Sequence, residues 1–133
     1  MIRLLIAGSR SITDANFCLR KLEALCQNQP IECIMSGMAS GPDMFGYEFA
    51  MNNGIKVIEF PITSEDWKRD GKKAGPLRNV KMLEEGKPTH LIAFNDCRNS
   101  PQGSNGTNHM IRISKKAGVK VHEVKYTRSP YGR

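Results

Sequence analysis

Three cations lie close together in residues 70–79, DGKKAGPLRN, where a helix is predicted to begin. Pro76 and the apolar spacing after it are typical of the first turn of a helix. The N-terminus of a helix already carries partial positive charge, so Lys72, Lys73 and Arg78 are unfavourably placed there. A bound anion would offset this, and the planar guanidinium of Arg78 can hold a phosphate through two hydrogen bonds. We therefore interpret the segment as one side of an anion site; the alternative is a solvated basic surface.

Three glycine-containing segments each follow an apolar run and precede a predicted helix: GSRS at 8–11, SGMASGPD at 36–43 and GSNGT at 103–107. Glycine permits a close approach of the backbone, and the free N–H groups at a helix start bind phosphate. Trp67 precedes the lysines and is a candidate to stack on a base, with packing in the core as the alternative. The predicted ligand-binding residues are Gly8, Ser9, Arg10, Ser36, Gly37, Gly41, Asp43, Trp67, Arg78, Asn79, Gly103, Gly106 and Thr107.

Several common cofactor and metal patterns are missing from the chain. It has neither the Walker pattern G-x-x-x-x-G-K-[ST] nor the dinucleotide pattern G-x-G-x-x-G, which disfavours ATP-driven and NAD-dependent chemistry. The four cysteines form no C-x-x-C pair and have no nearby histidines to complete a zinc site, so we interpret them as buried, reduced thiols. The sequence therefore predicts no cofactor and no metal.

The elements that position these residues alternate along the chain. Strand-like apolar runs alternate with segments of helical period, which predicts a parallel sheet covered on both faces. The expected fold class is α/β, a Rossmann-like, doubly wound parallel sheet of about five strands with helices on both faces. Residues 1–124 form a single domain in this interpretation, and residues 125–133 form a basic C-terminal tail. Strands are predicted at 2–7, 31–35, 55–60, 89–94 and 119–124, helices at 15–28, 42–53, 76–85 and 107–117, and a polar loop at 61–75.

Charge is distributed unevenly over the 133 residues, whose formal net charge is +7. Residues 1–66 hold five Lys/Arg and eight Asp/Glu, a net of −3, whereas residues 67–133 hold fifteen and five, a net of +10. This asymmetry indicates an anionic partner for the second half, with a merely solvated surface as the alternative. The chain has no apolar run of the roughly 20 residues that a membrane span needs, and its start does not fit a signal peptide. The expected location is cytoplasmic, with no membrane partner.

Taken together, four motifs resemble one known family. GSR at 8–10, SGMASGPD at 36–43, the W-x-x-x-G-K-x-A-G-P-x-R-N block at 67–79 and NGT at 105–107 resemble the YspA/YpsA-related branch of the SLOG superfamily. The resemblance covers residues 1–124. The superfamily includes the Lonely Guy phosphoribohydrolases and the Rossmann-like domain of DNA-processing protein A. The resemblance implies a Rossmann-like fold, a nucleotide, nucleotide-derived or nucleic-acid ligand, and a homo-oligomer.

One departure from the family concerns catalysis. Lonely Guy enzymes carry P-G-G-x-G-T-x-x-E, whose glutamate serves cleavage of the bond between base and ribose. The matching stretch here is G-S-N-G-T-N-H-M, so Met110 stands where that glutamate would be. Arg78 and Met82 match the family's R-x-x-x-M pattern. The remaining candidates for acid/base work are Asp43 and Glu48, for which the alternatives are a carboxylate stabilised by a helix dipole and an exposed helix position.

These observations lead to one expected function and two alternatives. The expected function is binding of a phosphorylated nucleoside or an ADP-ribose-like ligand, which the protein senses or sequesters. The first alternative is an enzyme that hydrolyses the N-glycosidic bond of a nucleoside phosphate with an unconventional carboxylate. The second is a nucleic-acid binding module that uses the basic second half of the chain.

Overall fold

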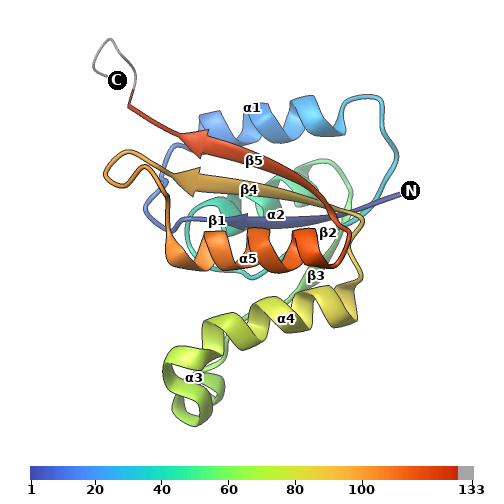
Figure 1. Cartoon of the computed structure of the whole chain (residues 1–133). Helices are drawn as coiled ribbons and strands as arrows, with labels where there is room; N and C mark the ends of the chain where they lie inside the picture. The colour runs from blue at the N-terminus through green and yellow to red at the C-terminus, as the bar shows by residue number, and fades with distance from the viewer. Residues whose placement is uncertain (129–133) are drawn as a thin grey trace.

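The computed structural model describes residues 1–128 and contains five strands that alternate with helices (Figure 1). No helix within these residues is long and apolar enough to cross a membrane. The strands are β1 (Ile2–Gly8), β2 (Ile31–Ser36), β3 (Lys56–Glu59), β4 (His90–Asp96) and β5 (Lys120–Tyr126). The helices are α1 (Ala15–Cys26), α2 (Pro42–Asn52), α3 (Ser64–Asp70), α4 (Ala74–Gly86) and α5 (Asn105–Lys116).

All five strands are parallel and lie in the order β3-β2-β1-β4-β5. The predicted α/β class and the Rossmann-like doubly wound sheet are therefore confirmed. The chain leaves β1 in one direction to form β2 and β3, and then returns to the other side of β1 to form β4 and β5. The loops after β1 and β4 consequently diverge at the carboxyl edge of the sheet, which is where doubly wound folds leave a crevice for ligands.

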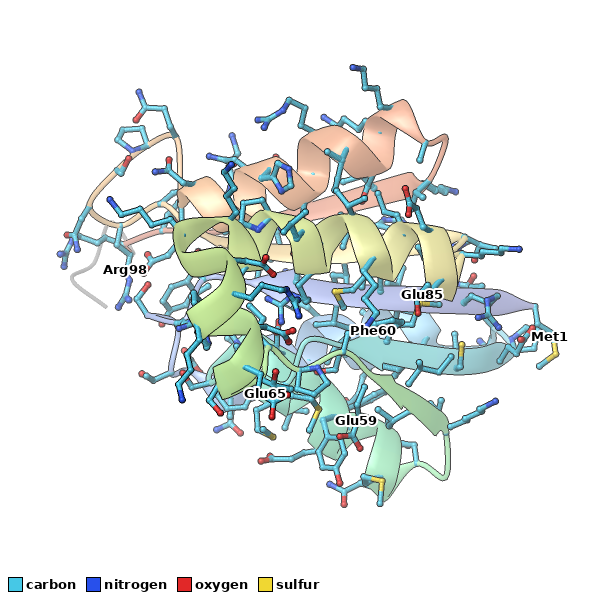
Figure 2. All side chains as sticks on the ribbon, turned by 90° about the horizontal axis from the view of Figure 1, so that it is seen from below. Met1, Glu59, Phe60, Glu65, Glu85 and Arg98 are labelled. Carbon is cyan, nitrogen blue, oxygen red and sulfur yellow. The ribbon has the colours of Figure 1, made fainter. Side chains whose placement is uncertain are left out.

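Alternating side chains of the strands build two cores, one on each face of the sheet. Ile6, Ile34 and Phe94 belong to the core beneath α1 and α2, whereas Met35 and Leu91 belong to the core beneath α4 and α5. Figure 2 shows α4 and α5 lying side by side over this second face. Burial of the sheet on both faces explains why the strands read as continuous apolar runs in the sequence.

The segment predicted as a polar loop at 61–75 is largely helical, so that prediction is wrong. Residues 64–70 form α3, and a 3₁₀ turn, Gly71–Lys73, joins it directly to α4. The hydroxyl of Thr63 accepts a hydrogen bond from the N–H of Asp66, and the Asp66 carboxylate accepts one from the N–H of Thr63. This reciprocal capping box starts α3, although none of the residues in the helix is buried. The spacing of apolar residues in the sequence therefore did not predict this helix.

Most other element boundaries differ from the prediction by one or two residues, and the start of α4 and the end of β5 are two examples. Helix α4 begins at Ala74, two residues before Pro76, which therefore occupies the third position of its first turn. Strand β5 extends to Tyr126, into the segment predicted as a tail, because its last residues pair with Asn95 and Asp96 of β4. Residues 129–133 of that predicted tail lie outside the described residues.

Candidate functional site

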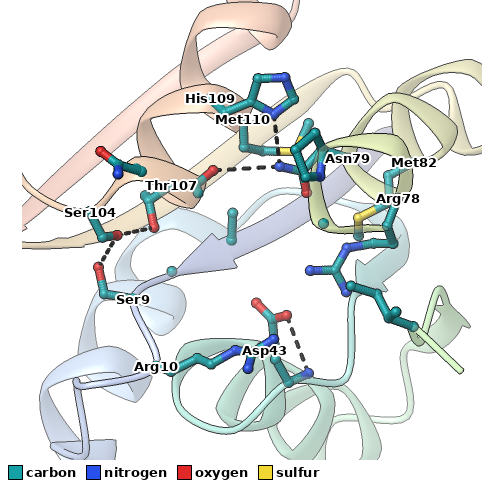
Figure 3. A pocket seen from close by; sticks show the side chains of 18 of the residues that line it. Ser9, Arg10, Asp43, Arg78, Asn79, Met82, Ser104, Thr107, His109 and Met110 are labelled. Atoms are coloured by element: carbon teal, nitrogen blue, oxygen red, sulfur yellow. Dashed lines mark hydrogen bonds between the residues drawn. The ribbon is translucent and has the colours of Figure 1, made fainter. Parts of the chain in front are cut away.

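A cavity of about 740 Å³ opens at the carboxyl edge of the sheet, where the loops after β1 and β4 diverge (Figure 3). The starts of α4 and α5 and one side of α3 complete its walls. A volume of this size is typical of a site for a small-molecule ligand. The predicted ligand-binding residues that line it are Gly8, Ser9, Arg10, Asp43, Trp67, Arg78, Asn79, Gly106 and Thr107.

Four predicted ligand-binding residues, together with Glu48, do not line this cavity. Ser36 lies beneath it, where its hydroxyl donates to the carbonyl of Asp43 at 2.8 Å. Gly41 is the N-cap of α2, and Gly37 and Gly103 pack against side chains that support the walls. Glu48 is an exposed residue of α2, which leaves Asp43 as the candidate acid/base residue that the cavity contains.

The residues Ser9, Ser104 and Thr107, which we call the hydroxyl cluster, line the cavity at the start of α5. The hydroxyl oxygens of Ser9 and Ser104 are 2.7 Å apart, and Ser104 donates to the Thr107 hydroxyl at 2.9 Å. The Ser9 hydroxyl also accepts from the N–H of Asp96 at 3.0 Å. Two loops that are distant in the sequence are thus joined through side chains that carry no charge.

The N-terminus of α5 has no side-chain cap. Ser104 is the N-cap residue, but its hydroxyl is engaged within the hydroxyl cluster and accepts nothing from the helix backbone. The first N–H groups of a helix have no partner within the helix. Those of α5 therefore remain available beside Gly106 and Thr107, at the positive end of the helix dipole.

A buried asparagine that the sequence analysis did not identify holds this end of α5 in place. Asn95 of β4 is fully buried, and its Oδ1 accepts from the N–H of Ser104 at 2.9 Å. Its Nδ2 donates to Asn108 at 2.8 Å and to Glu123 at 3.0 Å. The backbone of Gly103 passes so close to this amide that a side chain there would collide with it.

Asp43 and Arg78 lie across the cavity from the hydroxyl cluster, and the side chain of Arg10, which follows Ser9 in the chain, extends toward Asp43 (Figure 3). We call Arg10, Asp43 and Arg78 the charged cluster. Asp43 is only 5% exposed, and burial raises the pKa of its carboxyl group to about 6. The nearby charges of Arg78 and Arg10 and a hydrogen bond from the N–H of Ala39, at 3.4 Å, act in the opposite direction. Asp43 can therefore exchange a proton close to neutral pH, which an ordinary carboxylate does not.

The Arg78 guanidinium is only partly free to receive an anion. Its Nη1 donates to the carbonyl of Gly37 at 2.9 Å and to that of Phe60 at 3.3 Å, whereas Nε is buried without a partner among residues 1–128. Burial also lowers the pKa of Arg78, while the charge of Asp43 raises it. Nη2 is the nitrogen that remains for a ligand, so Arg78 both supports the loop after β2 and faces the cavity.

The two lysines before α4 have different positions. Lys72 lines the cavity, whereas Lys73 is exposed outside it. Trp67, on α3, is 43% exposed and also lines the cavity. The structure thus brings Trp67, Lys72 and Arg78 together around one space, although α3 was not predicted.

Two further observations concern chemistry at the site. Among the described residues, no group of three or more His, Cys, Asp or Glu is placed to hold a metal ion. Met110 is almost completely buried at the cavity wall and cannot carry a proton.

The fold and the cavity define a Rossmann-like domain with a cavity at the topological switch point of its sheet. The model of the YspA, cpYpsA-related SLOG family matches residues 2–69. The chain is 35% identical over 127 residues to the Gene 61 protein of Mycobacterium phage D29, covering 91% of this chain and 94% of that protein. It belongs to the YspA, cpYpsA-related SLOG family, as the motifs predicted, and this membership indicates a nucleotide-related ligand.

One solved structure with a similar fold is that of DNA processing protein A from Streptococcus pneumoniae. The similarity has a TM-score of 0.49 at 19% sequence identity and covers 90% of this chain. The chain spans 57% of the length of that structure.

Proposed function

We propose that the protein binds a nucleotide-derived ligand, a phosphorylated nucleoside or an ADP-ribose-like molecule, in the 740 Å³ cavity, and that it senses or sequesters this ligand. The observation that carries the proposal is the uncapped N-terminus of α5, which opens into the same cavity as Arg78. Free backbone N–H groups at a helix start and the planar guanidinium of arginine are both well suited to hold a phosphate.

The phosphate lies against Ser104 and the first turn of α5 in this proposal. Within the hydroxyl cluster Thr107 only accepts, so its hydroxyl can donate to a phosphate oxygen, and the helix dipole favours the negative charge. Asn95 and Gly103 position this first turn, because Asn95 accepts from the N–H of Ser104 and the backbone of Gly103 packs against the Asn95 amide.

The base extends toward Trp67 in this proposal, since an exposed indole at the cavity wall can stack on any base. Lys72 and Arg10 lie at the same opening and can meet a second phosphate or a ribose hydroxyl. A cavity of about 740 Å³ accommodates a mononucleotide and leaves room for a further substituent.

Mass spectrometry of the small molecules that heat releases from the purified protein tests this proposal, and a nucleotide is the expected result. Nucleoside phosphates and ADP-ribose should also raise the melting temperature, because a ligand that binds only the folded state stabilises it by mass action. No effect from a broad nucleotide panel at millimolar concentration would contradict the proposal.

A competition experiment separates this proposal from nucleic-acid binding. A polymer that binds through many phosphates loses affinity steeply as the salt concentration rises, whereas one phosphate in a cavity gives a shallow dependence. Tight, salt-sensitive oligonucleotide binding that no mononucleotide displaces would favour the nucleic-acid module instead.

Asp43 supports a second candidate function, hydrolysis of the N-glycosidic bond of a nucleoside phosphate. A carboxyl group with a pKa of about 6 inside the cavity can take a proton from water, whose oxygen attacks C1′ of the ribose. The base leaves as the bond between C1′ and nitrogen breaks, and it takes up a proton. The expected products are the free base and ribose 5-phosphate, which chromatography would detect; Asp43→Asn should abolish their formation but retain ligand binding.

The proposal also includes a homo-oligomer, which the family resemblance motivates. Leu77 of α4 is 51% exposed, which is compatible with a surface that a second copy covers. Light scattering coupled to size-exclusion chromatography would distinguish a monomer from an oligomer directly.

A further inference from the structure

Asn79 of α4 is almost buried, at 8% exposure, and it joins the wall of the cavity to α5. Its Nδ2 lies 3.1 Å from Nδ1 of His109 and 3.5 Å from the carbonyl oxygen of Gly106. Figure 3 marks the contact between Asn79 and His109 with a dashed line. Both contacts are to α5, so the amide group of Asn79 is held from the helix that faces it.

The chemistry of these partners fixes the orientation of the amide. A carbonyl oxygen can only accept a hydrogen bond, so the nitrogen of the amide, and not its oxygen, faces Gly106. Both hydrogens of Nδ2 are then engaged, and Nδ1 of His109 is an acceptor. His109 is accordingly neutral, with its proton on Nε2, and burial followed by the charge of Arg112 lowers its pKa in agreement with this state.

The remaining polar atom of the side chain, Oδ1, has no donor among residues 1–128. This oxygen is not fully buried, and the residue that carries it lines the cavity. Oδ1 is therefore accessible from the cavity. Asn79 thus offers the ligand an oxygen that can accept a hydrogen bond but cannot donate one.

The position of this oxygen determines which part of a nucleotide it meets. Asn79 contacts Gly106 in the first turn of α5, next to the proposed phosphate position. A phosphate oxygen without a proton is repelled by a second acceptor, whereas the sugar, the next group along a nucleotide, carries hydroxyl donors. The base lies further away, toward Trp67.

We propose that Asn79 is a specificity-determining residue that accepts a hydrogen bond from a ribose hydroxyl, so that the cavity selects ribonucleotides over deoxyribonucleotides. This inference rests on the proposed function. His109 is a positioning residue in it, because it acts on the ligand only through the amide of Asn79. A site that pairs with a hydroxyl discriminates against the analogue that lacks it, since the acceptor is then left without a partner.

The test is a comparison of affinities by calorimetry with nucleoside 5′-monophosphates as probes. The four ribonucleotides are compared with their 2′-deoxy and 3′-deoxy counterparts, which covers every base and both hydroxyls. The native protein should bind at least one ribonucleotide about tenfold more tightly than one of its deoxy forms. In Asn79→Ala this ratio should fall to about one, whereas in Asn52→Ala, an exposed asparagine on α2, it should not change.

The ratio separates a specific contact from general damage to the fold. A variant that merely loosens α4 weakens all nucleotides by the same factor and leaves the ratio intact, which would overturn the inference. Asn79→Asp keeps an acceptor at this position and should retain the preference for ribonucleotides even if all affinities fall. Equal binding of ribo and deoxy forms by the native protein would overturn the inference while leaving the proposed function standing; failure of every nucleotide to bind would overturn both.

Discussion

The hydroxyl cluster and the charged cluster face the same cavity but are stabilised in opposite ways. Ser9, Ser104 and Thr107 satisfy one another through hydrogen bonds and carry no charge, so this side is formed before any ligand arrives and does not respond to pH. The charged cluster contains a buried carboxyl group with a raised pKa and an arginine with an unpartnered Nε. Strongly perturbed ionisable groups at a cavity are typical of functional sites and cost stability in the free protein.

The largest expected effect concerns the loss of folding stability that the buried, ionised Asp43 causes. Because its pKa of about 6 in the folded protein exceeds the ordinary value of 3.8, the contribution of Asp43 to the free energy of unfolding is greatest below about pH 4 and is lost as the pH rises through 6. Asp43→Asn removes this cost, and its neutral amide oxygen can still accept from Ala39. The free energy of unfolding at pH 8 should rise by up to about 3 kcal/mol, since each pKa unit corresponds to about 1.4 kcal/mol.

Chemical denaturation of the native protein and of Asp43→Asn at pH 4 and pH 8 measures this effect. The difference between the two proteins should nearly vanish at pH 4. A constant difference at both values would show that Asp43 is not the group that makes the charged cluster costly.

Arg78→Ala should have the next largest effect, and it should lower both the nucleotide affinity and the free energy of unfolding. Nucleotide affinity should fall by about 1.5–3 kcal/mol, the range for a hydrogen bond to a charged group. The free energy of unfolding should also fall, and more at pH 8 than at pH 5, because Asp43 loses its strongest cationic neighbour and its pKa rises further.

Two variants serve as controls for Arg78→Ala in calorimetry and denaturation. Arg78→Lys keeps the charge but not the planar group, and should recover only part of the affinity. Lys73→Ala removes an exposed cation of the same segment that does not line the cavity, and should change neither quantity. Unchanged nucleotide affinity in Arg78→Ala would contradict a role for this arginine in the anion site.

A pair of glycine variants disturbs the two clusters separately, with a smaller expected effect. Gly103→Ala strains a residue with φ +83° and displaces Asn95, which holds Ser104, so it should cost about 1–2 kcal/mol and weaken nucleotide binding. Gly37→Ala displaces Arg78 and Asp43 and should alter the dependence of stability on pH. Gly118→Ala has a similar φ of +80° without any neighbour within 4 Å, and should lose stability without loss of affinity.

The sequence predicted the parts of the molecule that depend on local pattern. The apolar runs at β1 to β5, with the glycine-containing segments after β1, β2 and β4, were sufficient for the sheet and for the edge at which the cavity opens. Helix α3 was missed because its capping box stabilises it without apolar residues facing a core.

Contacts between distant segments could not be predicted in this way. Asn95 is the next-to-last residue of β4, just after its apolar run, and nothing near it in the sequence indicates that Ser104, Asn108 and Glu123 complete its hydrogen bonds. The carbonyls of Gly37 and Phe60 likewise occupy one nitrogen of the Arg78 guanidinium, which the sequence analysis assigned to a phosphate through two hydrogen bonds. A residue's available donors depend on tertiary neighbours, so residue type alone overestimates what Arg78 offers to a ligand.

An NMR titration of isotope-labelled protein with nucleoside 5′-monophosphates tests the central claim most directly, because it reports on each backbone amide separately. The largest shifts should occur at the amides of Asn105, Gly106 and Thr107, with a smaller response at the indole of Trp67. Mononucleotides that leave these amides unchanged, or oligonucleotides that instead shift exposed basic residues such as Lys115 and Lys120, would contradict binding at the cavity.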